Sequence, residues 1–144
     1  MPIPVKIFRR HPDAEIPAYQ TIGACAFDLA VVEDAVIPPG GQVRLRTGLV
    51  VCVPEGHALV VAPRSSLFRK KGLIVPHSIG IVDMDFCGPD DEILLGLQNA
   101  TDADVVVRKG ERLCQGMILP ISRAAFEEVT ALDAPSRGGW GSTG

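Results

Sequence analysis

The chain has 144 residues, of which 47% are hydrophobic, and a formal net charge of -3. It is long and apolar enough for one folded domain with a substantial core, which excludes disorder as the default. The slightly acidic balance argues against a protein that neutralises nucleic-acid phosphates, and one Trp, one Tyr and five Phe are too few for a base-stacking platform. We therefore expect no nucleic-acid partner. The composition does not exclude a small anionic ligand that a few suitably positioned cations would hold.

The sequence carries no membrane or leader signal. Residues 1–7 have no basic region followed by an apolar one, and no window of about twenty apolar residues occurs. We expect a cytoplasmic protein with no membrane partner. Cysteines stand at positions 25, 52, 87 and 114, without a C-x-x-C pattern and without histidine at metal-ligand spacing. We interpret them as small buried hydrophobic residues in a reducing compartment rather than as zinc ligands or disulfides.

Many short strands follow one another along the chain, separated by turns rich in proline and glycine. We expect them at residues 3–9, 31–37, 42–53, 57–62, 73–82, 92–98, 105–107, 113–121 and 124–132. Such spacing with scarcely any helix predicts an all-β sandwich, jelly roll or small barrel. Residues 135–144 are rich in glycine with little to bury, so we expect a mobile tail there.

Two segments have residue types that suit a bound ligand, the first more strongly than the second. Residues 63–72 predict one short helix with Ser65 or Ser66 as its N-cap. Arg64, two hydroxyls and three further cations at a helix N-terminus favour a bound phosphate, although a solvated helix face explains three of the four cations. Residues 21–30 place Asp28 among small residues, which let the backbone approach a ligand or another chain, with tight strand packing as the alternative.

The stretch from residue 77 to residue 92 is the one around which we expect the rest of the chain to be organised. Its first half alternates small and apolar residues as a half-buried strand does, and the turn formers Gly-Pro-Asp-Asp at 88–91 then end it. Because residues two apart on a strand share a face, we expect Asp83 and Asp85 to point one way and Phe86 the other, unless a bulge intervenes. A polar strand end that enters a hairpin is the plain alternative.

Five stretches, in order, resemble the five motifs of the trimeric dUTPase family. Any one is weak, but five in order before a glycine-rich C-terminus are highly specific. The resemblance implies a dUTPase-like jelly roll or distorted β-barrel with at most one short helix, in a homotrimer whose subunits share active sites. It also implies cleavage of dUTP to dUMP and pyrophosphate with Mg²⁺. The stretches are GACAFDL at 23–29, PRSSL at 63–67, GIVDMDFCG at 80–88, GERLCQ at 110–115 and RGGWGSTG at 137–144.

The resemblance gives the reacting groups their roles. Asp83 is expected to activate the attacking water as general base, with Gln115 beside the α-phosphate. Asp28 is expected to hold Mg²⁺ through coordinated water. Arg64 and Ser65, with Ser66, are expected to bind the phosphates.

The same resemblance assigns the base, the sugar and the tail. Phe86 packs under the deoxyribose and leaves no room for a 2′-hydroxyl, while the strand backbone that includes Gly80 and Val82 pairs with the uracil edge. His77 stands near the base, where many relatives carry asparagine. Residues 1–134 form a single β domain, and residues 135–144 close over the site. In this tail Trp140 stacks on the uracil, and the residues expected at the β- and γ-phosphates are Arg137, Ser142 and Thr143.

Some positions depart from the family pattern, so two alternative functions are considered beside the hydrolase. Phe27 and Phe86 replace tyrosines, and Trp140 replaces a phenylalanine. A dCTP deaminase shares the fold and the Arg-Ser-Ser-Leu motif, but it needs a glutamate directly after the position of Phe86, where Cys87 stands. A catalytically silent deoxynucleotide-binding protein on this fold is the second alternative.

Overall fold

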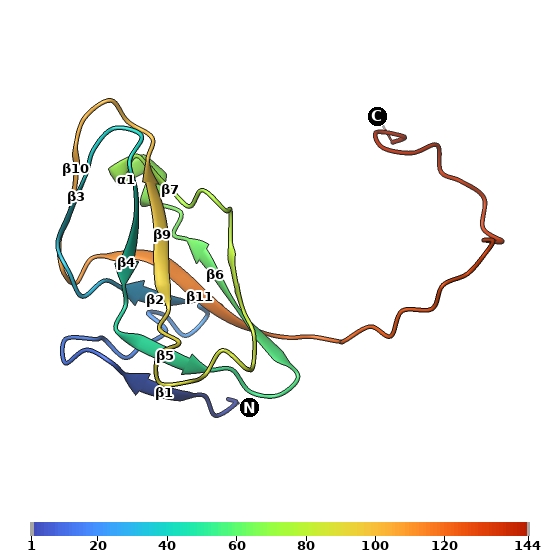
Figure 1. Cartoon of the computed structure of the whole chain (residues 1–144), viewed down its shortest axis with the longest axis horizontal. Coiled ribbons are helices and arrows are strands. Elements are labelled where there is room, and N and C mark those ends of the chain that lie inside the picture. Colours follow the sequence, from blue (N-terminus) through green and yellow to red (C-terminus); the bar gives the residue numbers. More distant parts are fainter. Residues whose placement is uncertain (1, 144) are drawn as a thin grey trace.

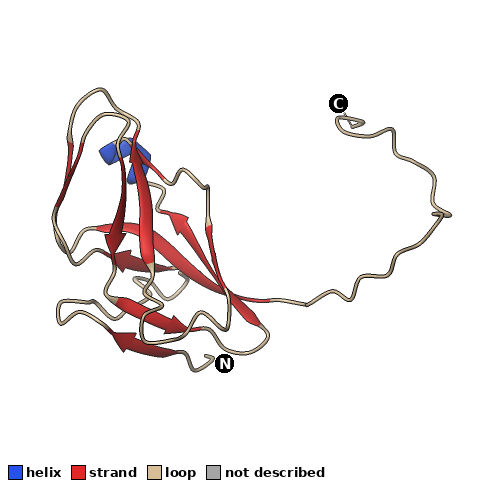
Figure 2. Ribbon diagram, in the orientation of Figure 1, coloured by secondary structure: helices blue, strands red, loops and turns tan. Residues whose placement is uncertain are grey.

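The computed structural model describes residues 2–143, and short strands make up nearly all of its regular structure (Figures 1 and 2). The short helix α1 (Leu67–Lys71) lies between β6 and β7 in the chain. The strands are β1 (Lys6–Arg9), β2 (Phe27–Ala30), β3 (Ala35–Ile37), β4 (Gln42–Arg46), β5 (Leu49–Cys52), β6 (His57–Pro63), β7 (Leu73–Ile74), β8 (Gly80–Val82), β9 (Leu94–Asn99), β10 (Val105–Val107) and β11 (Arg112–Pro120).

The strands form small antiparallel sheets whose neighbours are mostly distant in sequence. One sheet has the order β2-β11-β6-β8, a second has the order β4-β9-β7, and two pairs are β1-β5 and β10-β3. The chain therefore crosses repeatedly between sheets, and the predicted all-β class with at most one short helix is confirmed. Within residues 2–143 none of these sheets closes into a barrel. No helix in this part of the chain has the length and apolar character to cross a bilayer.

One apolar core lies between the sheets. In β9 every second residue is buried, which is the period of two expected for a strand with one face inside. Burying a leucine or valine side chain stabilises the fold by roughly 1.5–3 kcal/mol each. Among the most deeply buried side chains are Leu29, Leu59, Leu95, Leu97 and Val107.

Two predicted strands are each broken by an unusual backbone conformation. The expected strand 42–53 is divided into β4 and β5 at Gly48, whose φ of 70° favours glycine. A Cβ at this position would lie 2.8 Å from the Cβ of His11. The expected strand 73–82 is divided into β7 and β8 by a turn in which Ser78 has a φ of 72° and donates its N–H to Val75 O. Both breaks let the chain move from one sheet to another.

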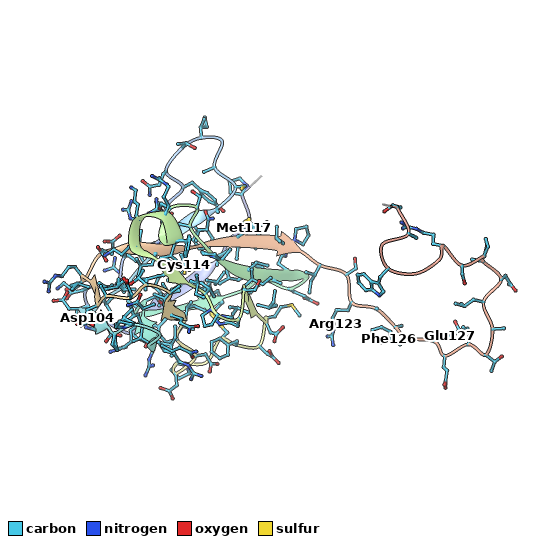
Figure 3. All side chains as sticks on the ribbon, turned by 90° about the horizontal axis from the view of Figure 1, so that it is seen from above. Asp104, Cys114, Met117, Arg123, Phe126 and Glu127 are labelled. Atoms are coloured by element: carbon cyan, nitrogen blue, oxygen red, sulfur yellow. A yellow bond between two sulfur atoms is a disulfide. The ribbon has the colours of Figure 1, made fainter. Side chains whose placement is uncertain are left out.

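The strand expected at residues 124–132 is absent from the described chain, and that prediction is wrong. Beyond β11 the segment leaves the body, with Phe126 and Glu127 on its extended part (Figure 3). Phe126 is 97% exposed and Leu132 is 83% exposed. A strand needs a neighbour to pair its N–H and C=O groups, and within residues 2–143 the segment has none.

Candidate active site

A cavity of ≈ 760 Å³ lies between β8 and β9. These strands follow one another in the chain but belong to different sheets, so they diverge. Gly80, Ile81 and Val82 are consecutive and all line the cavity, which means that the backbone edge of β8 contributes as well as alternate side chains. In the described chain β8 pairs with β6 alone, so it is an edge strand. The volume lies in the range of small-molecule sites.

The turn that follows β8 brings a carboxylate and an aromatic ring to this cavity. Asp83 and Phe86 both line it, whereas Asp85 does not. The prediction that Asp83 and Asp85 share a face opposite Phe86 is therefore wrong. The strand ends at Val82, and the N–H of Phe86 donates to Asp83 O at 3.3 Å, so a turn replaces the alternation of a strand. Phe86 is 41% exposed and has room to contact a ligand.

His77 lines the opposite rim of the same cavity. Its ring lies over β9 at Gly96, where a Cβ would come within 3.0 Å of the His77 Cε1 atom. The absence of a side chain at Gly96 thus makes the space for this ring. The structure therefore brings together five of the predicted site residues, which are His77, Gly80, Val82, Asp83 and Phe86.

The predicted phosphate and metal residues form a second cluster. Asp28 on β2 has a side chain only 13% exposed, and its carboxylate pairs with the Arg64 Nε atom at 3.0 Å. Arg112, which the sequence did not single out, places its Nη1 atom 4.0 Å from the other carboxylate oxygen. Gln115 on β11 lies opposite Asp28 and donates its side-chain N–H to Pro63 O at 3.1 Å. This cluster holds two cations and a carboxylate at a partly exposed surface.

The residues of the β2-β11-β6-β8 sheet that line the cavity come from both of its faces, whereas the Asp28 cluster occupies one face. Residues directly opposite each other on neighbouring strands share a face, and successive residues alternate. Asp28 and Gln115 are opposite each other and therefore share one face. Val61 and Cys114 line the cavity. Val61 lies opposite Gly116, next to Gln115 in the chain, so Val61 and Cys114 point to the other face, whereas Ile81, opposite Val60, shares the face of Gln115.

The helix α1 matches its prediction only in part. Ser66 is the N-cap residue, but its side chain makes no capping hydrogen bond, and Ser65 is exposed. Of the four predicted cations, Arg64 alone joins the Asp28 cluster. Lys71 pairs with Glu111 at 2.7 Å, and the other two are exposed in the last turn of α1, where a positive charge suits the negative end of the helix dipole.

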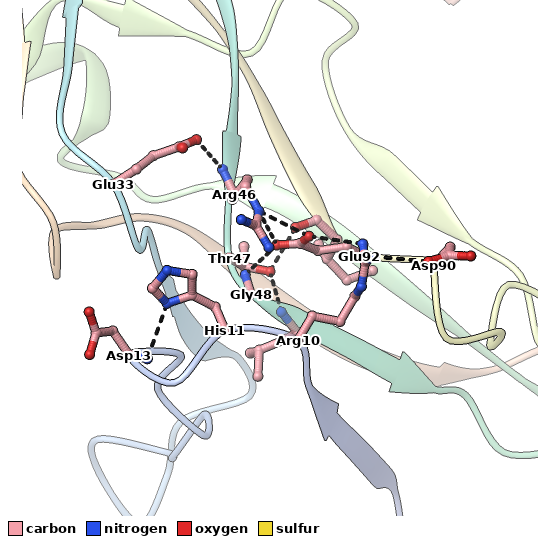
Figure 4. Close-up of polar contacts among 11 residues, drawn as sticks. Arg10, His11, Asp13, Glu33, Arg46, Thr47, Gly48, Asp90 and Glu92 are labelled. Atoms are coloured by element: carbon pink, nitrogen blue, oxygen red, sulfur yellow. Dashed lines mark hydrogen bonds and ion pairs between the residues drawn. The ribbon is translucent and has the colours of Figure 1, made fainter.

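A buried carboxylate, Glu92, fixes the end of the turn that carries Asp83 (Figure 4). Its side chain is 5% exposed and accepts hydrogen bonds from the N–H of Gly48 at 2.7 Å and from Arg46 Nε at 3.1 Å. Arg10 reaches both Glu92, at 3.4 Å, and Asp90, at 3.0 Å. A buried charge is tolerated only with such partners. The signal for Glu92 in the sequence was an acid directly before the apolar run at 93–95.

The interpretation of all four cysteines as buried and reduced is wrong. Cys52 and Cys87 form a disulfide with a Cα–Cα distance of 5.0 Å, and Cys25 is exposed. The partners are 35 residues apart, so only the fold of the turn after β8 onto β5 brings them together. Cys114 alone matches the prediction. Its burial raises the pKa of the thiol from the ordinary 9.0 to about 12, so Cys114 is protonated and serves as packing.

The predicted tail residues are not in contact with the cavity. Arg137, Trp140, Ser142 and Thr143 line a separate hollow that the tail itself forms. Trp140 is fully exposed there, at 106%. Within this chain the tail therefore does not close the site between β8 and β9.

The Asp28 cluster fits magnesium only together with a phosphate ligand. In the part of the chain that the structure describes, no group of three or more His, Cys, Asp or Glu side chains could hold a metal by itself. Magnesium keeps several waters and is commonly held by one or two carboxylates plus substrate phosphates. A single carboxylate, Asp28, beside the guanidinium groups of Arg64 and Arg112 would be a donor set of that kind once a phosphate is bound.

The chain is thus an all-β protein with a cavity at an edge strand and an arginine–carboxylate cluster on the same sheet, a combination suited to a small anionic ligand. Residues 12–144 match the dUTPase family. The chain belongs to this family, and the resemblance drawn from the five motifs is confirmed.

Three relatives illustrate the match. A deoxyuridine 5'-triphosphate nucleotidohydrolase of Wolinella succinogenes is 41% identical over 142 residues, covering 97% of this chain and 93% of that protein. The crystal structure of a dUTPase from Streptococcus mutans is 31% identical with a TM-score of 0.77, covering 85% of this chain and 98% of that one. A Staphylococcus bacteriophage 80alpha dUTPase with dUPNHPP has a TM-score of 0.86 at 21% identity and covers 98% of each chain, which supports the fold alone.

Proposed function

We propose that this chain hydrolyses dUTP to dUMP and pyrophosphate. The observation that carries the proposal is the cavity between β8 and β9, where the backbone edge of β8 is followed directly by Asp83 and Phe86. An edge strand offers unpaired N–H and C=O groups, which can pair with the alternating donors and acceptors of a uracil edge. A base with the wrong pattern would leave buried polar groups unpaired, so cytosine is rejected.

Asp83 is the proposed general base. It orients a water and takes its proton as the water attacks the α-phosphate, and Gln115 assists at that phosphate. Phe86 packs under the deoxyribose and leaves no room for a 2′-hydroxyl, and His77 contacts the base from the other rim. The pyrophosphate leaves in line with the attacking water.

The phosphates are assigned to the Asp28 cluster. Arg64 supplies a guanidinium to the phosphate oxygens, and the hydroxyls of Ser65 and Ser66 donate hydrogen bonds to them. Asp28 would hold Mg²⁺ through water, and the bound ion would neutralise charge on the triphosphate. When phosphates occupy this face, Arg64 exchanges part of its pairing with Asp28 for the ligand.

The active enzyme is proposed to be a homotrimer with shared sites. Asp83 lines the cavity just beyond the end of β8, whereas Gln115 is not among the residues that line this cavity. In the proposed trimer one copy supplies Asp83 and a neighbouring copy supplies Gln115 to each site. The tail, residues 135–144, is proposed to close such a site, with Trp140 stacked on the uracil and with Arg137, Ser142 and Thr143 at the β- and γ-phosphates.

The deaminase alternative needs a glutamate where Cys87 stands, and here that cysteine is used in a disulfide. The cytoplasmic location remains a prediction, and a disulfide in that compartment is uncommon and is more often regulatory than structural.

A substrate assay tests the function. The protein is incubated with Mg²⁺ and either dUTP or dCTP, and pyrophosphate and ammonia are measured separately. We expect pyrophosphate with dUMP from dUTP alone. Ammonia from dCTP would establish the deaminase, and dUTP binding without products would establish the silent binder. In the same assay a chain that ends at Ser136 should lose roughly 5–150-fold in kcat/KM, the equivalent of a base-stacking contact. Full activity of that shortened chain would refute closure by the tail.

A further inference from the structure

The turn that carries Asp83 is covalently tied to the neighbouring strand β5. Cys87 follows Phe86 directly and stands four residues after Asp83. It is bonded to Cys52, the last residue of β5, and Cys52 lies opposite Lys6 in the β1-β5 pair. The disulfide therefore joins the middle of the turn to a paired strand of the body.

The two ends of the turn have other anchors. At its start, β8 pairs with β6, and at its end Glu92 and Asp90 bind Arg46, Gly48 and Arg10 (Figure 4). Between these ends the hydrogen bonds are local, such as the N–H of Gly88 to Asp91 Oδ2 at 2.7 Å. Across the described chain, residues 83–89 make no hydrogen bond or ion pair outside the turn. The disulfide and the packing of Met84 against the core are what hold this middle part.

We propose that the Cys52–Cys87 disulfide is a positioning element of the site, and that reducing it slows hydrolysis. The inference rests on the proposed function, because it concerns the placement of Asp83 and Phe86. A displacement of about 1 Å at a reacting group can cost about 10²-fold in rate. The edge of β8 that binds the base is held by β6 and not by the disulfide. Reduction should therefore lower kcat more than it raises KM.

The redox step is a thiol–disulfide exchange. A dithiol such as dithiothreitol attacks the bond, supplies two electrons and two protons, and closes to its own disulfide, while Cys52 and Cys87 become thiols. Oxidised glutathione reverses the step. Because the thiol pools of a reducing compartment act on an accessible disulfide in the same way, the bond gives the activity a redox dependence.

The test compares the oxidised protein, the protein reduced with dithiothreitol, and the Cys52→Ser variant. The readouts are kcat and KM for dUTP and hydrogen–deuterium exchange of the amides at 83–89. On reduction we expect kcat to fall by about 10-fold or more, and exchange at 83–89 to accelerate while β11 stays protected. Reoxidation should restore both. Cys52→Ser should resemble the reduced protein with or without reductant, and the matched control Cys25→Ser should respond as the unmodified chain does.

Unchanged kcat and unchanged exchange after complete reduction, verified by thiol counting, would overturn the proposal. Accelerated exchange in β11 as well would also overturn it, because the bond would then stabilise the whole fold rather than the turn. If the oxidised protein does not hydrolyse dUTP, the proposed function fails, yet the exchange at 83–89 still decides whether the disulfide orders the turn.

Discussion

Asp83 and Asp85 are two residues apart, yet the turn between them separates their environments. Asp83 lines the cavity, and Asp85 is an exposed side chain outside it. A strand would have put both on one face, but the strand ends at Val82. The two carboxylates therefore form a natural pair of test and control, since each has the same charge and nearly the same place in the chain.

We expect Asp83→Asn to lower kcat for dUTP by about 10²–10⁴-fold, the range for loss of a general base. The amide has nearly the same shape but cannot take the proton, so the Kd for dUTP should change little. Steady-state kinetics and equilibrium binding measure the two quantities. Asp85→Asn should retain kcat within about a factor of two, because a surface substitution away from the site has little effect. Equal losses of kcat in both variants would mean that the total negative charge of the turn, and not Asp83 in particular, supports the reaction.

At the scale of a strand, Gly116 in β11 lies where the packing leaves no room for a side chain. A Cβ there would lie 2.6 Å from Phe27 Cε2 and 3.0 Å from Leu59 Cδ1. Phe27 is buried and cannot move without opening the core. Overpacking of this kind typically costs about 1–3 kcal/mol. Gly116→Ala should therefore lower the free energy of unfolding by that amount.

Urea denaturation measures this loss as a lower transition midpoint with an unchanged slope. The control is Gly23→Ala, where an added Cβ would meet nothing within 4 Å and φ is not positive. That variant should unfold at the midpoint of the unmodified chain or slightly above it. A midpoint for Gly116→Ala equal to that of the control would mean that β2 relaxes away from β11 without cost.

The elements that could be predicted are those whose signal is local. Alternation in the sequence identified β4, and proline or glycine marked the turns before β4 and before β9. The break at Gly48 could not be predicted, because its φ is required by the packing of His11 and Ala14, which lie far away in sequence. The strand expected at 124–132 is absent for the converse reason: its residues have strand-like patterning, but the part of the chain that the structure describes offers it no partner strand. Local propensity decides little when pairing is long-range.

The candidate site could likewise be predicted only in part. Its residues could be identified from the five motifs, because each motif is contiguous in sequence. The strand register that puts Asp28 opposite Gln115, the approach of Arg112 to Asp28 and the pairing of Cys52 with Cys87 depend on contacts between distant segments. No spacing rule in one chain reveals such contacts.

At the scale of the whole molecule, the separation of Asp83 from Gln115 leads to a complementation experiment. If one copy supplies Asp83 and another supplies Gln115, a mixture of two inactive variants will contain some intact sites. Asp83→Asn and Gln115→Ala are each expected to be nearly inactive alone, because each removes one half of every site. Denatured together in equal amounts and refolded, random assortment in a cyclic trimer should leave about one quarter of the sites with both side chains.

The mixture should therefore recover about one quarter of the dUTP turnover of the unmodified chain per site. Each variant refolded alone is the control, and mixing the two after separate refolding should recover nothing until subunits exchange. Light scattering of each sample checks that the same oligomer forms from chains of 15.3 kDa. Recovery no greater than the sum of the single variants would mean that Asp83 and Gln115 of one chain serve the same site.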